Sequence, residues 1–125
     1  LMQDRPDPVE LLEAVATFLR EHVAASIEGR VSFHARVAAN MLDIVRREIE
    51  LGPQSQAREL QGLRALLGAD APAGLAQANR LLCERIAAGL LDAAAPELHQ
   101  HLLQTARDKL AIDQPGYAAA AERKD

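Results

Sequence analysis

The chain has 125 residues, enough for one ordinary domain and too few for two. Apolar residues make up 49% of it and aromatic residues only 2%, and its many alanines and leucines favour helices over strands. The net charge of −4 argues against nucleic-acid binding, no apolar run is long enough to span a membrane, and the single cysteine excludes an internal disulfide framework. We therefore expect a soluble, cytoplasmic, all-α protein, with one domain over residues 5–117 and a frayed tail over residues 118–125.

The first predicted helix has a clear beginning. Asp7 can cap it, Pro8 suits its first position, and Glu10 follows Asp7 by three residues as in a capping box. Apolar residues then recur every three or four positions, until Gly29 breaks the pattern.

The second helix is predicted over residues 30–51, ended by Gly52 and then Pro53. Its apolar arc is broad, which predicts a central helix, and comprises Phe33, Val37, Ala38, Met41, Leu42, Ile44, Val45 and Ile49. A narrow polar stripe on the other side comprises Ser32, Arg36, Asn40, Asp43, Arg47 and Glu50. Asp43 and Arg47, spaced i,i+4, are expected to pair at the surface.

Three further helices are predicted, over residues 54–67, 75–91 and 96–112, with a loop at residues 68–74. Each has apolar residues on one face. Five amphipathic helices with short connections predict a compact bundle.

The sequence contains none of the common catalytic or cofactor motifs. There is no G-x-G-x-x-G, P-loop, H-E-x-x-H or G-x-S-x-G, and no Glu is followed three positions later by His. His99 and His101 are two residues apart on a helix and cannot hold one metal ion together. We therefore expect no metal and no cofactor.

Several polar residues fall within predicted apolar faces. These are His34 and Glu48 in the second helix, Asn79 in the fourth, Lys109 and His99 in the fifth, and His22 in the first. If they converge, the bundle contains a polar pocket in which burial and charge shift pKa values. The structural interpretation competes with this one, because a histidine or asparagine on an apolar face is more often a hydrogen-bonded core residue.

Two segments carry a resemblance, Phe33–Asn40 and Lys109–Tyr117. With them, the chain resembles a small bacterial family of unknown function, over residues Arg5 to Tyr117. The resemblance implies genes beside aminoglycoside-phosphotransferase-like kinases and acyl-CoA dehydrogenases. The family's recurring polar positions correspond here to Arg36, Asn40 and Asn79.

Two functions remain open. The first is an accessory helical protein, not an enzyme, that forms a homodimer or binds an acyl-CoA dehydrogenase or phosphotransferase-like protein, since the broad apolar arc exceeds what one bundle contact needs. The second is a binding protein or minor enzyme for an anionic, coenzyme A- or nucleotide-like molecule. In that case His34 is the acid or base, and Arg36, Asn40 and Asn79 orient the ligand. We expect neither function to involve nucleic acid or a membrane.

Overall fold

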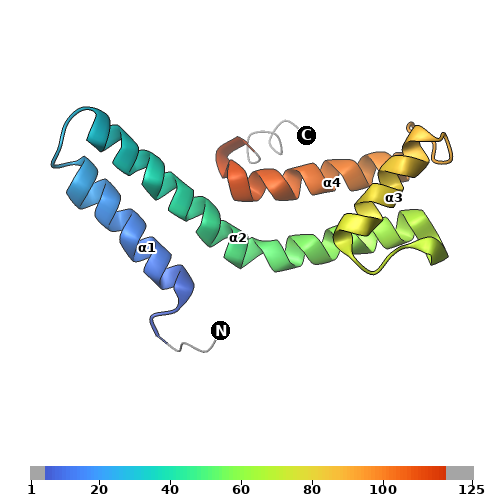
Figure 1. Cartoon of the computed structure of the whole chain (residues 1–125), viewed down its shortest axis with the longest axis horizontal. Coiled ribbons are helices and arrows are strands. Elements are labelled where there is room, and N and C mark those ends of the chain that lie inside the picture. The colour runs from blue at the N-terminus through green and yellow to red at the C-terminus, as the bar shows by residue number, and fades with distance from the viewer. Residues whose placement is uncertain (1–4, 118–125) are drawn as a thin grey trace. The chain divides into compact units, whose positions relative to one another are not determined.

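The computed structural model describes residues 5–117, and the tail predicted over residues 118–125 lies outside them. The prediction of an all-α protein is confirmed, because the described residues form helices and turns without a strand (Figure 1). The elements are α1 (Pro8–Phe18), a π-helical turn (Leu19–Ala24), α2 (Arg30–Leu67), a 3₁₀ turn (Gly68–Asp70), α3 (Leu75–Ala87) and α4 (Pro96–Asp113). None of these helices combines the length and the apolar character that a membrane crossing requires.

The beginning of α1 follows the sequence prediction. The Asp7 side chain accepts a hydrogen bond of 2.9 Å from the backbone N–H of Glu10, and Pro8 occupies the first turn. The Glu10 carboxylate pairs with Arg5. Gly29 adopts a φ of +83°, a left-handed conformation that turns the chain into α2 at little steric cost to glycine.

The predicted helix end at Gly52 and Pro53 is wrong, because α2 runs without interruption from Arg30 to Leu67. Pro53 removes one backbone donor, and its ring ordinarily clashes with the Cβ of the preceding residue. Here that residue is Gly52, which has no Cβ and does not adopt a left-handed φ. The clash with a preceding Cβ is therefore absent, whereas the missing hydrogen bond to the Ile49 carbonyl and the crowding of that carbonyl by the proline ring remain.

The contacts of the chain divide it at this same point into an N-terminal unit, up to Gly52, and a C-terminal unit, from Pro53. Each unit is described by itself. The single domain predicted over residues 5–117 stays a prediction.

The N-terminal unit is an antiparallel helical hairpin of α1, the π-helical turn and the first part of α2. Residue numbers rise along one helix as they fall along the other, since Arg20 contacts Asp43 and the Ser32 hydroxyl bonds the carbonyl of Ala24 at 2.8 Å. The buried apolar residues of this unit are all alanines: Ala16, Ala24, Ala35 and Ala39. Small side chains let the two helix backbones approach closely, and they bury little apolar surface.

The C-terminal unit packs the rest of α2 against α3 and α4. Its core cluster comprises Leu63, Leu67, Ala78, Leu82 and Leu98. The three helices each contribute to this cluster, so the unit closes around leucine side chains that are at most 4% exposed.

Candidate functional site

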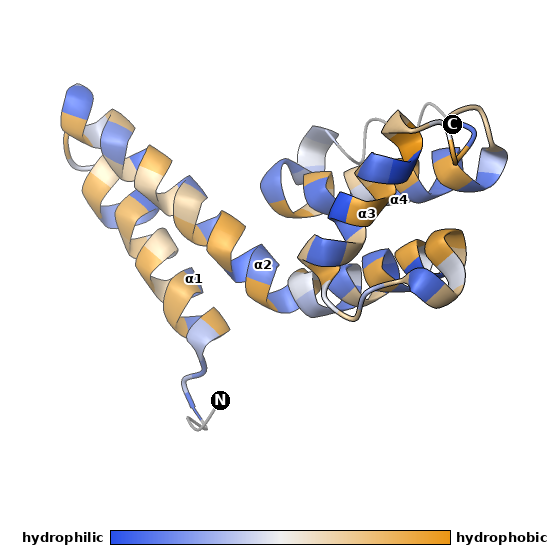
Figure 2. Ribbon diagram, turned by 45° about the vertical axis from the view of Figure 1, so that its right-hand side comes forward, coloured by the Kyte–Doolittle hydropathy of each residue, from blue (hydrophilic) through white to orange (hydrophobic). Residues whose placement is uncertain are grey.

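Ten large apolar side chains in the described part of the N-terminal unit are exposed, and six of them form two stripes, one on each helix. The six are Leu11, Val15 and Phe18 in α1 and Met41, Val45 and Ile49 in α2. Their exposed fractions lie between 40% and 61%, and Figure 2 shows apolar residues along both helices. We call this set the hairpin apolar face.

Both stripes lie on the same side of the hairpin. At about 100° per residue, each stripe is centred roughly 100–130° around its helix from the buried alanines of that helix. Viewed along each helix from its N-terminus, the stripe is turned from the buried alanines in the same direction in α1 and in α2. Because the helices are antiparallel, equal rotations of the same sense place the two stripes side by side on one surface.

The opposite side of the hairpin carries charged and polar contacts. Arg20 bonds the side-chain oxygen of Asn40 at 2.7 Å and pairs with Asp43. Arg46 lies 4.0 Å from Glu13 and 3.8 Å from Asp43, and its Nε is buried without a hydrogen-bond partner. Part of the polar stripe predicted for the second helix therefore faces α1 and the π-helical turn, while half of the broad apolar arc is exposed, namely Phe33, Met41, Val45 and Ile49.

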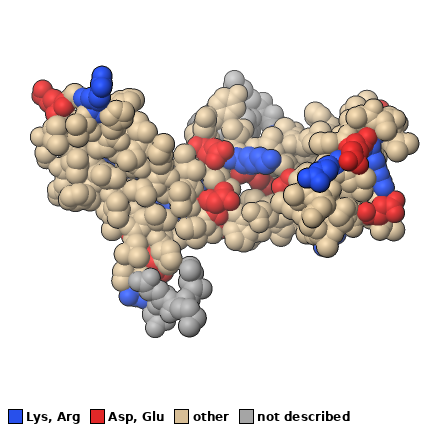
Figure 3. All heavy atoms as spheres, in the orientation of Figure 1, with Lys and Arg blue, Asp and Glu red and all other residues tan. Residues whose placement is uncertain are grey.

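The charge distribution agrees with this division. Over α1 and the first part of α2, the surface in Figure 3 is mostly free of Lys, Arg, Asp and Glu atoms. A contiguous apolar surface with few charges is typical of a protein-binding site, whereas single exposed apolar residues are ordinary.

Three of the four predicted ligand residues lie in the N-terminal unit. His34 and Arg36 are exposed, and the His34 ring contacts the neighbouring Phe33 ring edge-on at a centroid distance of 5.6 Å. Asn40 is also exposed and accepts the bond from Arg20. Arg36 and Asn40, four residues apart, share a side of α2, whereas His34 lies on the side that carries Met41.

Asn79, the fourth predicted residue, lies in the C-terminal unit. Its side-chain amide donates a hydrogen bond of 3.0 Å to Glu59, and so ties α3 to α2. Lys109 and Glu48, which were expected within apolar faces, are both exposed. The Glu48 carboxylate folds back over Gly52, 3.2 Å from where a Cβ would stand. A ligand role for His34, Arg36, Asn40 and Asn79 stays a prediction.

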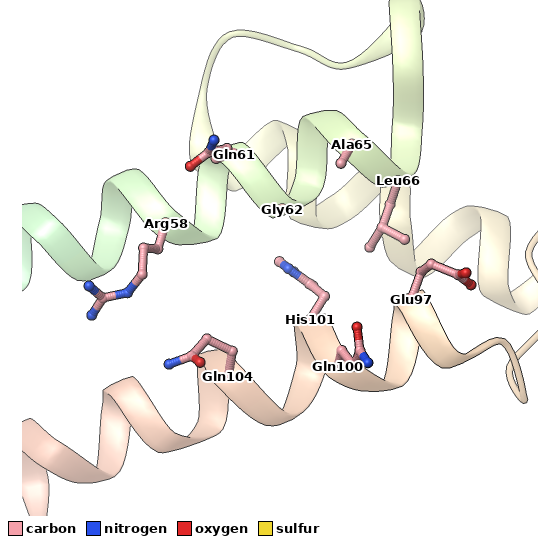
Figure 4. Close-up of a pocket in the computed structure, with 9 residues that line it drawn as sticks. All are labelled: Arg58, Gln61, Gly62, Ala65, Leu66, Glu97, Gln100, His101 and Gln104. Carbon is pink, nitrogen blue, oxygen red and sulfur yellow. The ribbon is translucent and has the colours of Figure 1, made fainter.

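The C-terminal unit contains a cleft of about 500 Å³ between α2 and α4. Its polar lining includes Arg58, Gln61, Glu97, Gln100, His101 and Gln104. Figure 4 shows the His101 ring extending from α4 toward Gly62 in α2. A Cβ at Gly62 would lie 2.2 Å from His101 Nδ1, so the absence of a side chain there makes room for the imidazole.

One end of this cleft is held by a bidentate ion pair. Arg58 bonds the two carboxylate oxygens of Asp108 at 3.1 and 3.0 Å, which raises the pKa of Arg58 through these hydrogen bonds and the charge of Asp108. Gln104 adds a bond of 3.1 Å to Asp108. Sequence reasoning missed this cleft, and the only available signal was a glycine, Gly62, inside a helix.

A comparison with known protein families identifies the family to which the chain belongs. The model of the domain-of-unknown-function family DUF6285 matches residues 25–117. The chain belongs to the DUF6285 family. No curated protein and no solved structure matches it.

The DUF6285 match begins at Ala25, twenty residues after the Arg5 expected from the resemblance. It includes the whole cleft of the C-terminal unit and the α2 stripe of the hairpin apolar face. The α1 stripe precedes the matched residues. Membership carries no assigned activity, and the implied bacterial origin and gene neighbours stay predictions.

Proposed function

We propose that this DUF6285 protein is an accessory helical protein that acts by binding another protein surface through the hairpin apolar face. The observation that carries the proposal is the placement of six large apolar side chains, each at least 40% exposed, on one side of a hairpin whose buried apolar residues are alanines. Exposed apolar surface of this extent is unfavourable in water and is stabilised when a partner covers it.

The metabolic setting of the partner is a finer part of the proposal. The resemblance noted in the sequence supports a link to acyl-CoA or phosphotransferase-type metabolism, with a dehydrogenase or a phosphotransferase-like protein as the bound protein. The proposed role involves no catalysis. The expected cytoplasmic location stays a prediction.

Site-specific photocrosslinking tests the interaction. A benzoylphenylalanine at position 45, on the hairpin apolar face, is expected to yield a crosslinked protein product in cells that produce the chain. The matched control carries the same residue at position 90, since Leu90 is 74% exposed but lies in the C-terminal unit. Products from position 45 that exceed those from position 90 support the proposal, and equal yields or none from position 45 contradict it.

A small polar molecule bound by the C-terminal unit is the second candidate function. The observation in its favour is the cleft between α2 and α4, where side-chain amides, an imidazole and a guanidinium line about 500 Å³. None of His34, Arg36, Asn40 and Asn79 lines this cleft. Because Arg58 is already paired with Asp108 and Glu97 also lines the cleft, these residues favour a neutral polar ligand, and the anionic coenzyme A- or nucleotide-like ligand stays a prediction.

A further inference from the structure

We propose that the occupant of the hairpin apolar face is the same face of a second copy of this chain, related by a two-fold axis at Met41. This inference rests on the proposed function and names the partner. Two hairpins placed face to face about this axis form a four-helix arrangement, in which Met41 meets Met41, and Val45 and Ile49 lie opposite Val37 and Phe33 of the second copy.

The position of two polar residues indicates the register. Three polar residues in the first part of α2 share the side of the helix with Met41: Arg30, eleven residues from it, and His34 and Glu48, each seven residues from it. If α2 of one copy lies antiparallel to α2 of the other with the axis at Met41, His34 of each copy stands opposite Glu48 of the other. An imidazole N–H then donates to a carboxylate on both sides of a Met41–Met41 contact.

The distribution of other charges favours the same occupant. The contacts of Arg20, Asp43 and Arg46 join the two helices within one hairpin, so face-to-face association leaves these contacts intact. An isologous interface must be complementary to itself. A surface with apolar residues along both helices, and with one donor and one acceptor at equal distances on either side of Met41, meets this condition.

The apolar area is sufficient for a specific contact. A large apolar side chain offers roughly 150–200 Å² when fully exposed. Half exposure at six positions therefore amounts to about 500 Å² per copy and about 1,000 Å² in total, which reaches the size expected of a biological interface. The alanine core of the hairpin gives it a further need for a partner, since two helices in contact through alanines bury little apolar surface.

Sedimentation equilibrium of the full chain over a wide range of concentration tests the pairing. The wild type is expected to be a dimer. Met41→Glu puts two carboxylates opposite each other on the axis and is expected to raise the dissociation constant by about a hundredfold or more. Leu90→Glu, at the 74% exposed position in the C-terminal unit, is the matched control and is expected to remain dimeric. Circular dichroism checks that both variants keep their helix content.

A charge exchange tests the register itself. His34→Glu places a carboxylate opposite Glu48 of the second copy, and Glu48→Lys places an ammonium opposite His34 of the second copy; each is expected to weaken the dimer. The double variant restores opposite charges at both places and is expected to recover most of the lost affinity. Recovery in the double variant is not expected from a merely structural role, because His34 and Glu48 are fourteen residues apart in one chain.

The outcomes separate this inference from the proposed function. A monomeric wild type, or a dimer that Met41→Glu leaves intact, overturns the pairing at this face. If position 45 still crosslinks to a different protein, the proposed function survives and the second copy is the wrong occupant. If the two single charge variants weaken the dimer and the double variant does not recover, the register at Met41 is overturned.

Discussion

The two units of this protein use the same kinds of residue in opposite places. In the C-terminal unit leucines form the core, and Leu63 is fully buried among Leu67, Leu82 and Leu98. In the N-terminal unit the buried apolar residues are alanines, and many of the large apolar side chains are exposed. Apolar content alone therefore does not predict a closed core, because the face that meets the neighbouring helix decides what is buried.

The largest expected effect comes from breaking the leucine core. Leu63→Ala removes a side chain with 0% exposure, and it should lower the free energy of unfolding by about 2–5 kcal/mol through lost burial and a residual cavity. Urea unfolding followed by circular dichroism measures the change. Leu90→Ala, at a 74% exposed leucine of the same unit, should change it by less than about 0.5 kcal/mol. Equal losses in the two variants would mean that the C-terminal unit lacks the core described above.

The corresponding change in the hairpin works in the opposite direction, by adding volume. Ala39 has 0% exposure, so Ala39→Leu must push α1 and α2 apart, at a cost of about 1–3 kcal/mol. Amide hydrogen exchange should show faster exchange in α1, with little change in α3 and α4. Ala14→Leu, at an exposed position of α1, is the matched control and should leave exchange unchanged. Unaltered protection of α1 in Ala39→Leu would contradict close packing through alanines.

Local sequence signals predicted the elements of the fold well. Asp7 and Gly29 mark helix boundaries because capping and a left-handed φ depend on one or two residues. The predicted end at Gly52 and Pro53 was wrong, because α2 continues through both residues; the glycine before the proline removes one of the clashes that disfavour a helix there.

The faces of the helices were harder to predict. Periodicity separates the apolar arc of α2 from its polar stripe, but it does not say which of them meets α1. Here Asn40 and Asp43 of the polar stripe contact Arg20, and half of the apolar arc is left exposed. The cleft was missed for a related reason, since Gly62 and His101 are far apart in the sequence and only the fold brings them together.

The contact between Gly62 and His101 yields the smallest effect and the sharpest test of the C-terminal unit. Alanine is more favourable than glycine inside a helix by about 1 kcal/mol. With His101 present, however, the new Cβ would lie 2.2 Å from Nδ1, so the ring must leave its place over the helix. We therefore expect Gly62→Ala to destabilise the wild type by about 1 kcal/mol.

The same substitution should have the opposite sign once the imidazole is removed. In a His101→Ala background nothing obstructs the added methyl group, and Gly62→Ala should stabilise the protein by about 1 kcal/mol. The difference between the two backgrounds, measured by urea unfolding, is the coupling energy of this contact. If Gly62→Ala were stabilising with His101 in place, the imidazole would not rest against α2.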